Sequence, residues 1–139
     1  MMKTIKKPNY EEILKNDGIK FEPIDGEKIV YKIVKKEKGQ LKNIMRSFNG
    51  SMKIDTNKWY KAERVIGRDG SSGVDGKSSW YITGIHCVEA HEDAVKYLKN
   101  FRRKDERVIY KCIARGAQWI KPTNEKVLLV DELKFIEEM

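Results

Sequence analysis

The segment 107–115 constrains the fold more than any other part of the chain, because its apolar residues recur at every second position. Val108, Tyr110, Cys112 and Ala114 form one wholly apolar face. Such a face is typical of a strand that lies in the middle of a sheet, with neighbours on both sides. The segment therefore predicts a central β-strand around which the rest of the fold is built.

The same period of two predicts the other strands. Alternating residues over 28–34 and 41–48 flank Gly39, a residue that permits a tight turn, so these two segments form a β-hairpin. The remaining strand-like segments are 59–66, 79–88 and 127–136. In the last of these, Asp131-Glu132 interrupts the apolar pattern as a bulge or turn.

Two helices are predicted. Asn9 with Glu12 three residues later forms a capping box, and Gly18 ends the short helix that follows. The main helix spans 91–104, with acidic residues in its first turn and basic residues in its last, as the helix dipole prefers. Its apolar stripe consists of Ala94, Tyr97, Leu98 and Phe101.

These elements fit one domain, since 139 residues is a common length for a single hydrophobic core. The short helix and its lead-in occupy 1–27, and a β-rich core occupies 28–137. We predict an α+β fold, in which a curved, mostly antiparallel sheet carries the 91–104 helix on one face. A partly closed barrel is equally compatible with the pattern.

The charge balance points to an anionic partner. Lys and Arg number 29 against 21 Asp and Glu, so the formal net charge is +8. This excess favours binding to nucleic acid, to a nucleotide or to an acidic protein surface. No apolar run approaches the ~20 residues that a membrane-spanning helix needs, so no membrane partner is expected.

No catalytic, metal or cofactor site is predicted. Gly76-Lys77-Ser78 is similar to the end of a phosphate-binding loop, but Ser71 stands where that motif needs glycine, and a strand follows instead of a helix. Cys87 and Cys112 lack the close spacing of zinc ligands and are predicted to be buried, reduced thiols. His86 and Cys87 are adjacent on a strand and point to opposite faces, so they cannot act as a nucleophilic pair.

We predict instead an anion-binding surface at strand ends and at the glycine-rich loop 67–78, because such positions combine a rigid support with solvent access. Its members are Arg46, Arg64, Arg68, Lys77, His86 and Arg115. A secondary basic face on the main helix consists of Lys96, Lys99 and Arg103, for which an ordinary solvated face is the alternative. Several aromatic residues near lysines and arginines either stack nucleobases or pack in the core: Trp59, Tyr60, Trp80, Tyr81 and Trp119.

Three segments together resemble a family of small, uncharacterised domains of phages and prophages. They are Tyr81 to Cys87 with its Gly84-Ile85-His86-Cys87 end, Glu92 to Leu98, and Val108 to Gly116. The resemblance implies origin and fold and carries no activity. Together with the charge, it favours a non-enzymatic accessory protein that binds an anionic partner in the bacterial cytoplasm, where interference with host defence would suit any of the partners considered.

The alternative is an enzyme. Gly116-Ala117, Glu125 and Val127-Leu128-Leu129 are similar to the closing strands of ADP-ribosyltransferases, in which a glutamate orients the nicotinamide ribose. The similarity implies that Glu125 would be the catalytic carboxylate, facing a cleft near His86, Tyr31 or an arginine. The Ser-Thr-Ser segment of such enzymes is missing, so we favour the binding protein.

Overall fold

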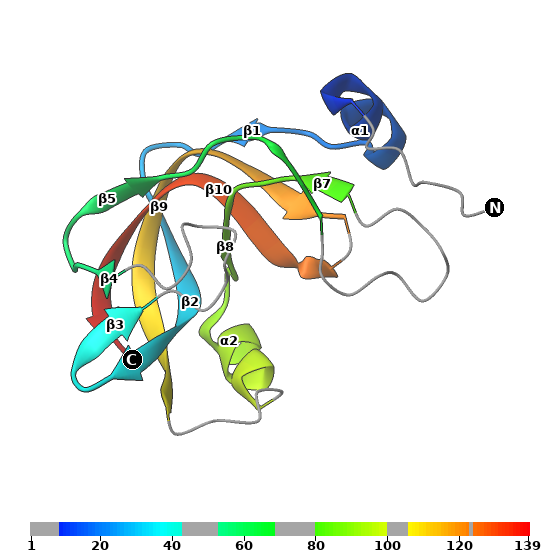
Figure 1. Cartoon of the computed structure of the whole chain (residues 1–139). Helices are drawn as coiled ribbons and strands as arrows, with labels where there is room; N and C mark the ends of the chain where they lie inside the picture. The colour runs from blue at the N-terminus through cyan, green and yellow to red at the C-terminus, as the bar shows by residue number, and fades with distance from the viewer. Residues whose placement is uncertain (1–8, 43–52, 69–79, 100–105, 123) are drawn as a thin grey trace.

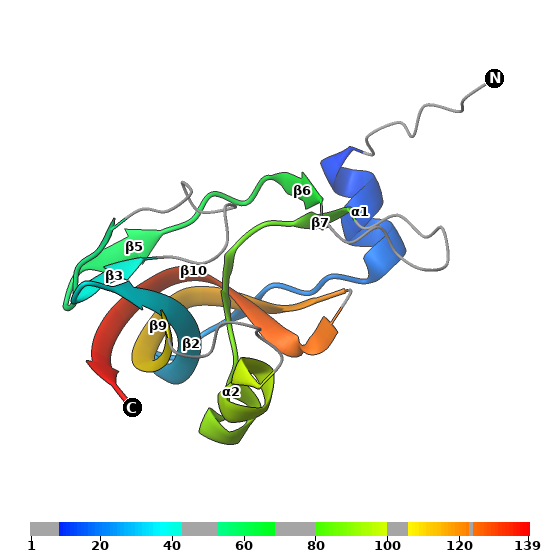
Figure 2. The same cartoon turned by 60° about the horizontal axis from the view of Figure 1, so that its bottom comes forward.

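A computed structural model describes residues 9–42, 53–68, 80–99, 106–122 and 124–139. Two long strands, β9 (Arg107–Lys121) and β10 (Asn124–Glu138), form a bent hairpin to which the other strands attach (Figure 1). The helices are α1 (Tyr10–Asp17) and α2 (His91–Leu98), which lie far apart in both views (Figures 1 and 2). The shorter strands are β1 (Glu22–Pro23), β2 (Lys28–Glu37), β3 (Gln40–Lys42), β4 (Lys53–Ile54), β5 (Trp59–Lys61), β6 (Ile66–Arg68), β7 (Trp80–Ile82) and β8 (Ile85–Cys87).

The main sheet has the order β4-β3-β2-β9-β10-β5. In addition, β1 pairs with the part of β9 that β2 does not reach, and β8 pairs with the part of β10 that β5 does not reach. Every pairing is antiparallel, and β6 and β7 form a separate two-stranded sheet. The prediction that 107–115 is a central strand is confirmed, since β9 lies between β2 and β10. The sheet is strongly curved, and an isolated bridge joins Tyr31 to Val88, but the sheet is not closed into a barrel.

Two sides of the sheet carry different cores. We call the side that holds the largest cluster the inner face; residues such as Val30, Cys112 and Leu133 point to it and are fully buried. On the opposite, outer face, α2 covers one area through Ala94 against Ile109. Elsewhere on the outer face, α1 and the β6–β7 pair cover a second cluster around Trp119, Leu129, Ile13, Tyr81 and Ile82. Consecutive residues of β10 are therefore buried, because Leu128 and Val130 face the inner core and Leu129 faces the second.

The caps of the N-terminal helix and the turn of the first hairpin are confirmed, whereas residues 43–48 of the predicted second hairpin strand lie outside the described residues. Asn9 caps α1 by accepting a hydrogen bond from the backbone N–H of Glu12 at 2.8 Å, and Gly18 ends the helix with φ +60°. Between β2 and β3, Lys38 and Gly39 both have positive φ, which suits a two-residue hairpin turn.

Two predicted strands are interrupted. The segment 79–88 divides at Thr83-Gly84, where the chain leaves β6 and begins to pair with β10. Gly84 lies so close to the ring of Trp119 that an added Cβ would come within 2.7 Å of it. The predicted strand 59–66 is interrupted after Lys61. There the backbone of Glu63 and Val65 instead hydrogen-bonds to the Thr83 side chain. The main helix ends at Leu98, its Tyr97 is exposed, and Phe101 lies outside the described residues.

The irregularity predicted at Asp131-Glu132 is confirmed as a β-bulge, although its extra residue lies in β9 rather than in β10. Pairing shifts between Val130 and Glu132, where Gly116 and Ala117 of β9 lie opposite the single residue Asp131. Gly116 has φ +90°, and an added Cβ would meet the Asp131 side chain at 2.9 Å. The Asp131 carboxylate accepts a hydrogen bond from the Ala117 backbone N–H at 2.9 Å and two from Arg64, at 2.8 and 2.7 Å.

Partial burial of Asp131 would by itself raise its pKa. The hydrogen bonds from Arg64 and from Ala117 outweigh that effect and hold the pKa below its ordinary value of 3.8. The ionised carboxylate is therefore the form that stabilises the bulge.

We expect Asp131→Ala to lower the free energy of unfolding by about 2 kcal/mol at neutral pH, because both donors lose a charged acceptor. Arg64→Ala keeps the bond from Ala117 and should cost less. Urea denaturation measures both. Because the pKa of Asp131 is lower in the folded state, its contribution to the free energy of unfolding is fully present above pH 3.8. This contribution is lost as the pH falls through the folded-state pKa. A wild-type-like Asp131→Ala variant would show that the bulge does not need this carboxylate.

Candidate functional site

The outer face of the sheet carries a strip that the described helices leave exposed. Side chains alternate along a strand, so the residues between the inner core residues of β9 and β10 point outward. One row of neighbours crosses four strands and consists of Trp59, Lys134, Ile113 and Ile29. The next row consists of Lys61, Glu132 and Arg115. At the end of the first row, Ile29 is 51% exposed, which is unusual for a large apolar side chain in a sheet.

Trp59 and its cationic neighbours form the centre of this strip. The guanidinium carbon of Arg115 lies 3.8 Å from the centre of the Trp59 ring, and the Lys134 ammonium lies 4.8 Å from it. Arg115 also donates from Nε and Nη2 to the two carboxylate oxygens of Glu132, both at 3.2 Å. Lys61 lies opposite Glu132 and is exposed. We call Trp59, Lys61, Arg115 and Lys134 the cation–aromatic patch.

The residues of the predicted anion-binding surface are distributed over several places. Arg115 belongs to the patch. Arg64 instead pairs with Asp131 and lies over the rings of Phe21 and Trp119, at 4.2 and 5.1 Å from their centres. His86 is half-buried in β8 with its ring against Tyr81.

Other predicted members are only partly described. The backbone of Arg68 lies in β6, and Lys96 and Lys99 are exposed at α2. Arg46, Lys77 and Arg103 lie outside the described residues, as do loop residues 69–78.

Sequence reasoning named Trp59 among the candidate stacking residues but missed Lys134. A signal for Lys134 was present, because it stands between two residues that point inward, Leu133 and Phe135. The rule that places neighbours of core residues outward would have found it. The same rule does not predict the contact between Lys134 and Trp59, because this contact depends on the register between β5 and β10.

The inner core contains two thiols and one lysine. Cys87 and Cys112 are free and buried, as predicted. Burial raises the pKa of Cys87 to about 12 and also raises that of Cys112, so both thiols are protonated and unreactive at neutral pH. Lys32 is 7% exposed, and its ammonium donates to the backbone carbonyl of His86 at 2.8 Å. Burial lowers the pKa of Lys32 from its ordinary value of 10.5.

We expect Lys32→Met to be at least as stable as the wild type at pH 7, because methionine has a similar length and no charge to desolvate. A lowered folded-state pKa means that the unfolded chain binds more protons between that pKa and 10.5. The wild type should therefore gain stability relative to Lys32→Met as the pH rises through this window. Urea denaturation at pH 7 and pH 10 tests this, with Lys96→Met as the control for loss of an exposed lysine. A pH-independent difference between wild type and Lys32→Met would contradict the buried charge.

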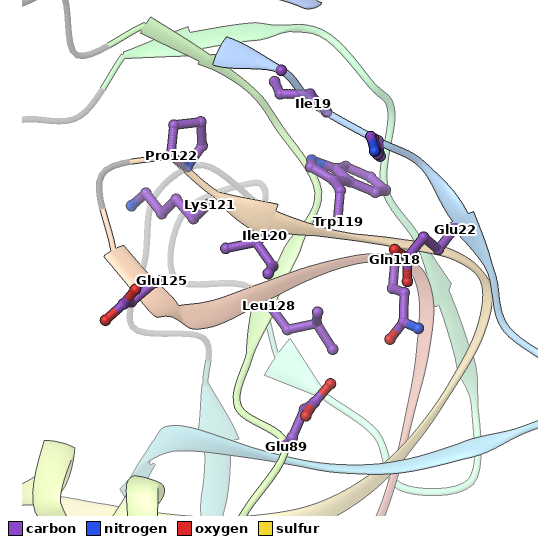
Figure 3. Close-up of a pocket in the computed structure, with 12 residues that line it drawn as sticks. Ile19, Glu22, Glu89, Gln118, Trp119, Ile120, Lys121, Pro122, Glu125 and Leu128 are labelled. Carbon is purple, nitrogen blue, oxygen red and sulfur yellow. The ribbon is translucent and has the colours of Figure 1, made fainter.

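Glu125 lines a cavity of about 360 Å³ at the far end of the β9–β10 hairpin (Figure 3). Trp119, Ile120 and Leu128 form its apolar part, and in Figure 3 Glu125 lies to the left of Ile120 and Glu89 below Leu128. The cavity lining also includes two lysines, Lys20 and Lys121, and a third glutamate, Glu22. Among the described residues that line it there is neither His86, Tyr31 nor an arginine.

Comparisons with protein-family models, with curated proteins and with solved structures give no significant match. The resemblance to small phage domains stays a prediction, so function has to be inferred from geometry and charge. Within the described ranges, no three His, Cys, Asp or Glu side chains are grouped closely enough to hold a metal ion. Among those same residues, no helix is long and apolar enough to cross a membrane.

Proposed function

We propose that this basic protein binds nucleic acid through the cation–aromatic patch. The observation that carries the proposal is a half-exposed tryptophan held against a guanidinium and an ammonium on an exposed sheet face. Proteins that bind nucleic-acid strands combine basic groups, which attract phosphates, with flat groups on which bases stack.

The charges of the strip support this choice. Lys61, Lys134, Arg115 and the neighbouring Lys111 contribute four positive charges, against two negative charges from Glu132 and Glu137. Lysines are well suited to phosphate, because a flexible ammonium can follow a backbone without reading its sequence. The net charge of +8 would add a long-range attraction that speeds the encounter.

The cavity at Glu125 is a weaker site for such a partner. Its lining holds three carboxylates and two ammonium groups, and the Lys121 ammonium lies over the ring of Tyr81, 4.8 Å from its centre. Lys28 also pairs with Glu89 at the cavity, so the charges there balance and give a polyanion no net attraction. The outer strip is therefore the better candidate for phosphate binding.

We expect Lys61→Gln combined with Lys134→Gln to weaken binding of a fluorescent single-stranded oligonucleotide about tenfold at about 50 mM salt. Two lost phosphate contacts should also make the slope of log K against log salt shallower by about 1.4. Fluorescence anisotropy at about 50 and 200 mM salt measures both quantities.

The matched control is Lys96→Gln combined with Lys99→Gln, which removes the same charge from α2. This pair should change affinity only slightly. A larger loss in the α2 variant would move the site to the secondary basic face. No binding of any nucleic acid at the lower salt would leave an acidic protein surface or a free nucleotide as the partner, and a role against host defence would then rest on one of those.

The enzymatic alternative has one observation in its favour, which is that Glu125 lines a cavity. An ADP-ribosyltransferase would bind NAD⁺ there, so NAD⁺ would raise the melting temperature of the wild type and not that of Glu125→Gln. We expect no such shift, because the charges at the cavity balance once Lys28 is paired with Glu89, and its lining holds no arginine among the described residues to bind a pyrophosphate. A shift that Glu125→Gln abolishes, and that Glu92→Gln on α2 leaves intact, would favour the enzyme.

A further inference from the structure

We infer that Arg115 is a platform on which an unpaired nucleobase stacks, so that the patch recognises single-stranded nucleic acid. This inference rests on the proposed function and adds the class of strand to it. It follows from how each side of the Arg115 guanidinium is used.

One face of the guanidinium is covered by Trp59. The guanidinium carbon is only 3.8 Å from the ring centre, which is the ordinary separation of carbon atoms in contact. A nitrogen pointing straight at the ring would be closer than van der Waals contact allows. We infer that the planar group lies approximately flat on the tryptophan, because this arrangement keeps all three nitrogens outside van der Waals overlap.

One edge of the guanidinium is occupied by Glu132. Two parallel hydrogen bonds of 3.2 Å, from Nε and Nη2, fix the plane of the group. Glu132 is the direct neighbour of Arg115 across the β9–β10 ladder, and Gly116 of the bulge follows Arg115 immediately. Rigid backbone on both strands therefore holds the platform in place before any ligand arrives.

We infer that the second face of the guanidinium is open to solvent, because Trp59 covers one face and Glu132 one edge. The Arg115 side chain is 41% exposed, and no hydrogen bond of Nη1 is present among the described residues. A base stacked on this face would form a three-layer arrangement with the guanidinium and the Trp59 ring. Guanidinium planes are a known support for unstacked bases.

The neighbouring lysines favour a strand over an isolated base. Lys61 is opposite Glu132 and Lys134 lies over Trp59, so each of the two rows that hold the stacked pair also carries an ammonium group. They can contact the phosphates that flank the stacked nucleotide. In a duplex the base faces are already stacked on one another, so Arg115 would contribute only its charge.

The test compares a 15-nucleotide deoxythymidine strand with an abasic strand of the same length, which has the same phosphates and no bases. The wild type should bind the thymidine strand about tenfold more tightly than the abasic strand. Arg115→Lys keeps the charge and removes the plane, so this ratio should fall to about one while the affinity for the abasic strand changes less than about threefold. Anisotropy at about 50 mM salt gives all four affinities.

Each outcome separates the inference from the proposed function. Equal binding of the two strands by the wild type would overturn the stacking platform and leave the nucleic-acid interface intact. A ratio unchanged in Arg115→Lys would place the base elsewhere and also overturn it. Binding of neither strand would refute the proposed function itself. Because equal binding by the wild type would by itself overturn the stacking platform, the inference can be refuted even if Arg115→Lys does not fold.

Discussion

The carboxylate of Asp131 joins parts of the chain that are far apart in the sequence. It receives Arg64 from the β5–β6 connection and the backbone N–H of Ala117 from β9. Backbone carbonyls of the same bulge bind two further parts of the chain. The Asp131 carbonyl accepts a hydrogen bond from the Ala62 N–H, and the Gly116 carbonyl accepts one from the Ile24 N–H. Four segments thus depend on one irregular position, where a side chain at Gly116 would not fit.

The bulge explains why the protein has hydrophobic cores on both sides of one sheet. Leu133 and Val130 lie on either side of the bulge and both point into the inner core. In a regular strand, residues three positions apart would point to opposite faces, so the bulge changes the alternation. Leu129 can then face the second core. The two outer covers, α2 and the α1 cluster, do not meet over the described part of the sheet. The strip with the cation–aromatic patch is the area left between them, so the site is a consequence of how the cores are divided.

Local features of the fold were predictable from the sequence, whereas pairings over long distances were not. The cap at Asn9, the turn at Gly39, the central strand and the bulge all depend on residues close together, and all are confirmed. Arg64 was assigned to an anion-binding surface because it lies on the predicted strand that leads into the glycine-rich loop. Its partner Asp131 is 67 residues away, and only the fold brings the two together. The Trp59 contacts with Arg115 and Lys134 escaped for the same reason, since they require the register of three strands.

The long hairpin has a further consequence for the order in which the chain folds. In the sequence, β9 and β10 follow all the other strands, yet β2, β1, β5 and β8 pair with one or the other of them. On a ribosome, the earlier strands would emerge with only short partners, such as β3 for β2 and β7 for β6. Closing the large loops between early and late strands costs chain entropy before the contacts form, which slows folding. The edge of β2 that pairs with β9 would stay unpaired until β9 has been synthesised, and during that interval the nascent chain would be most open to chaperones and to aggregation.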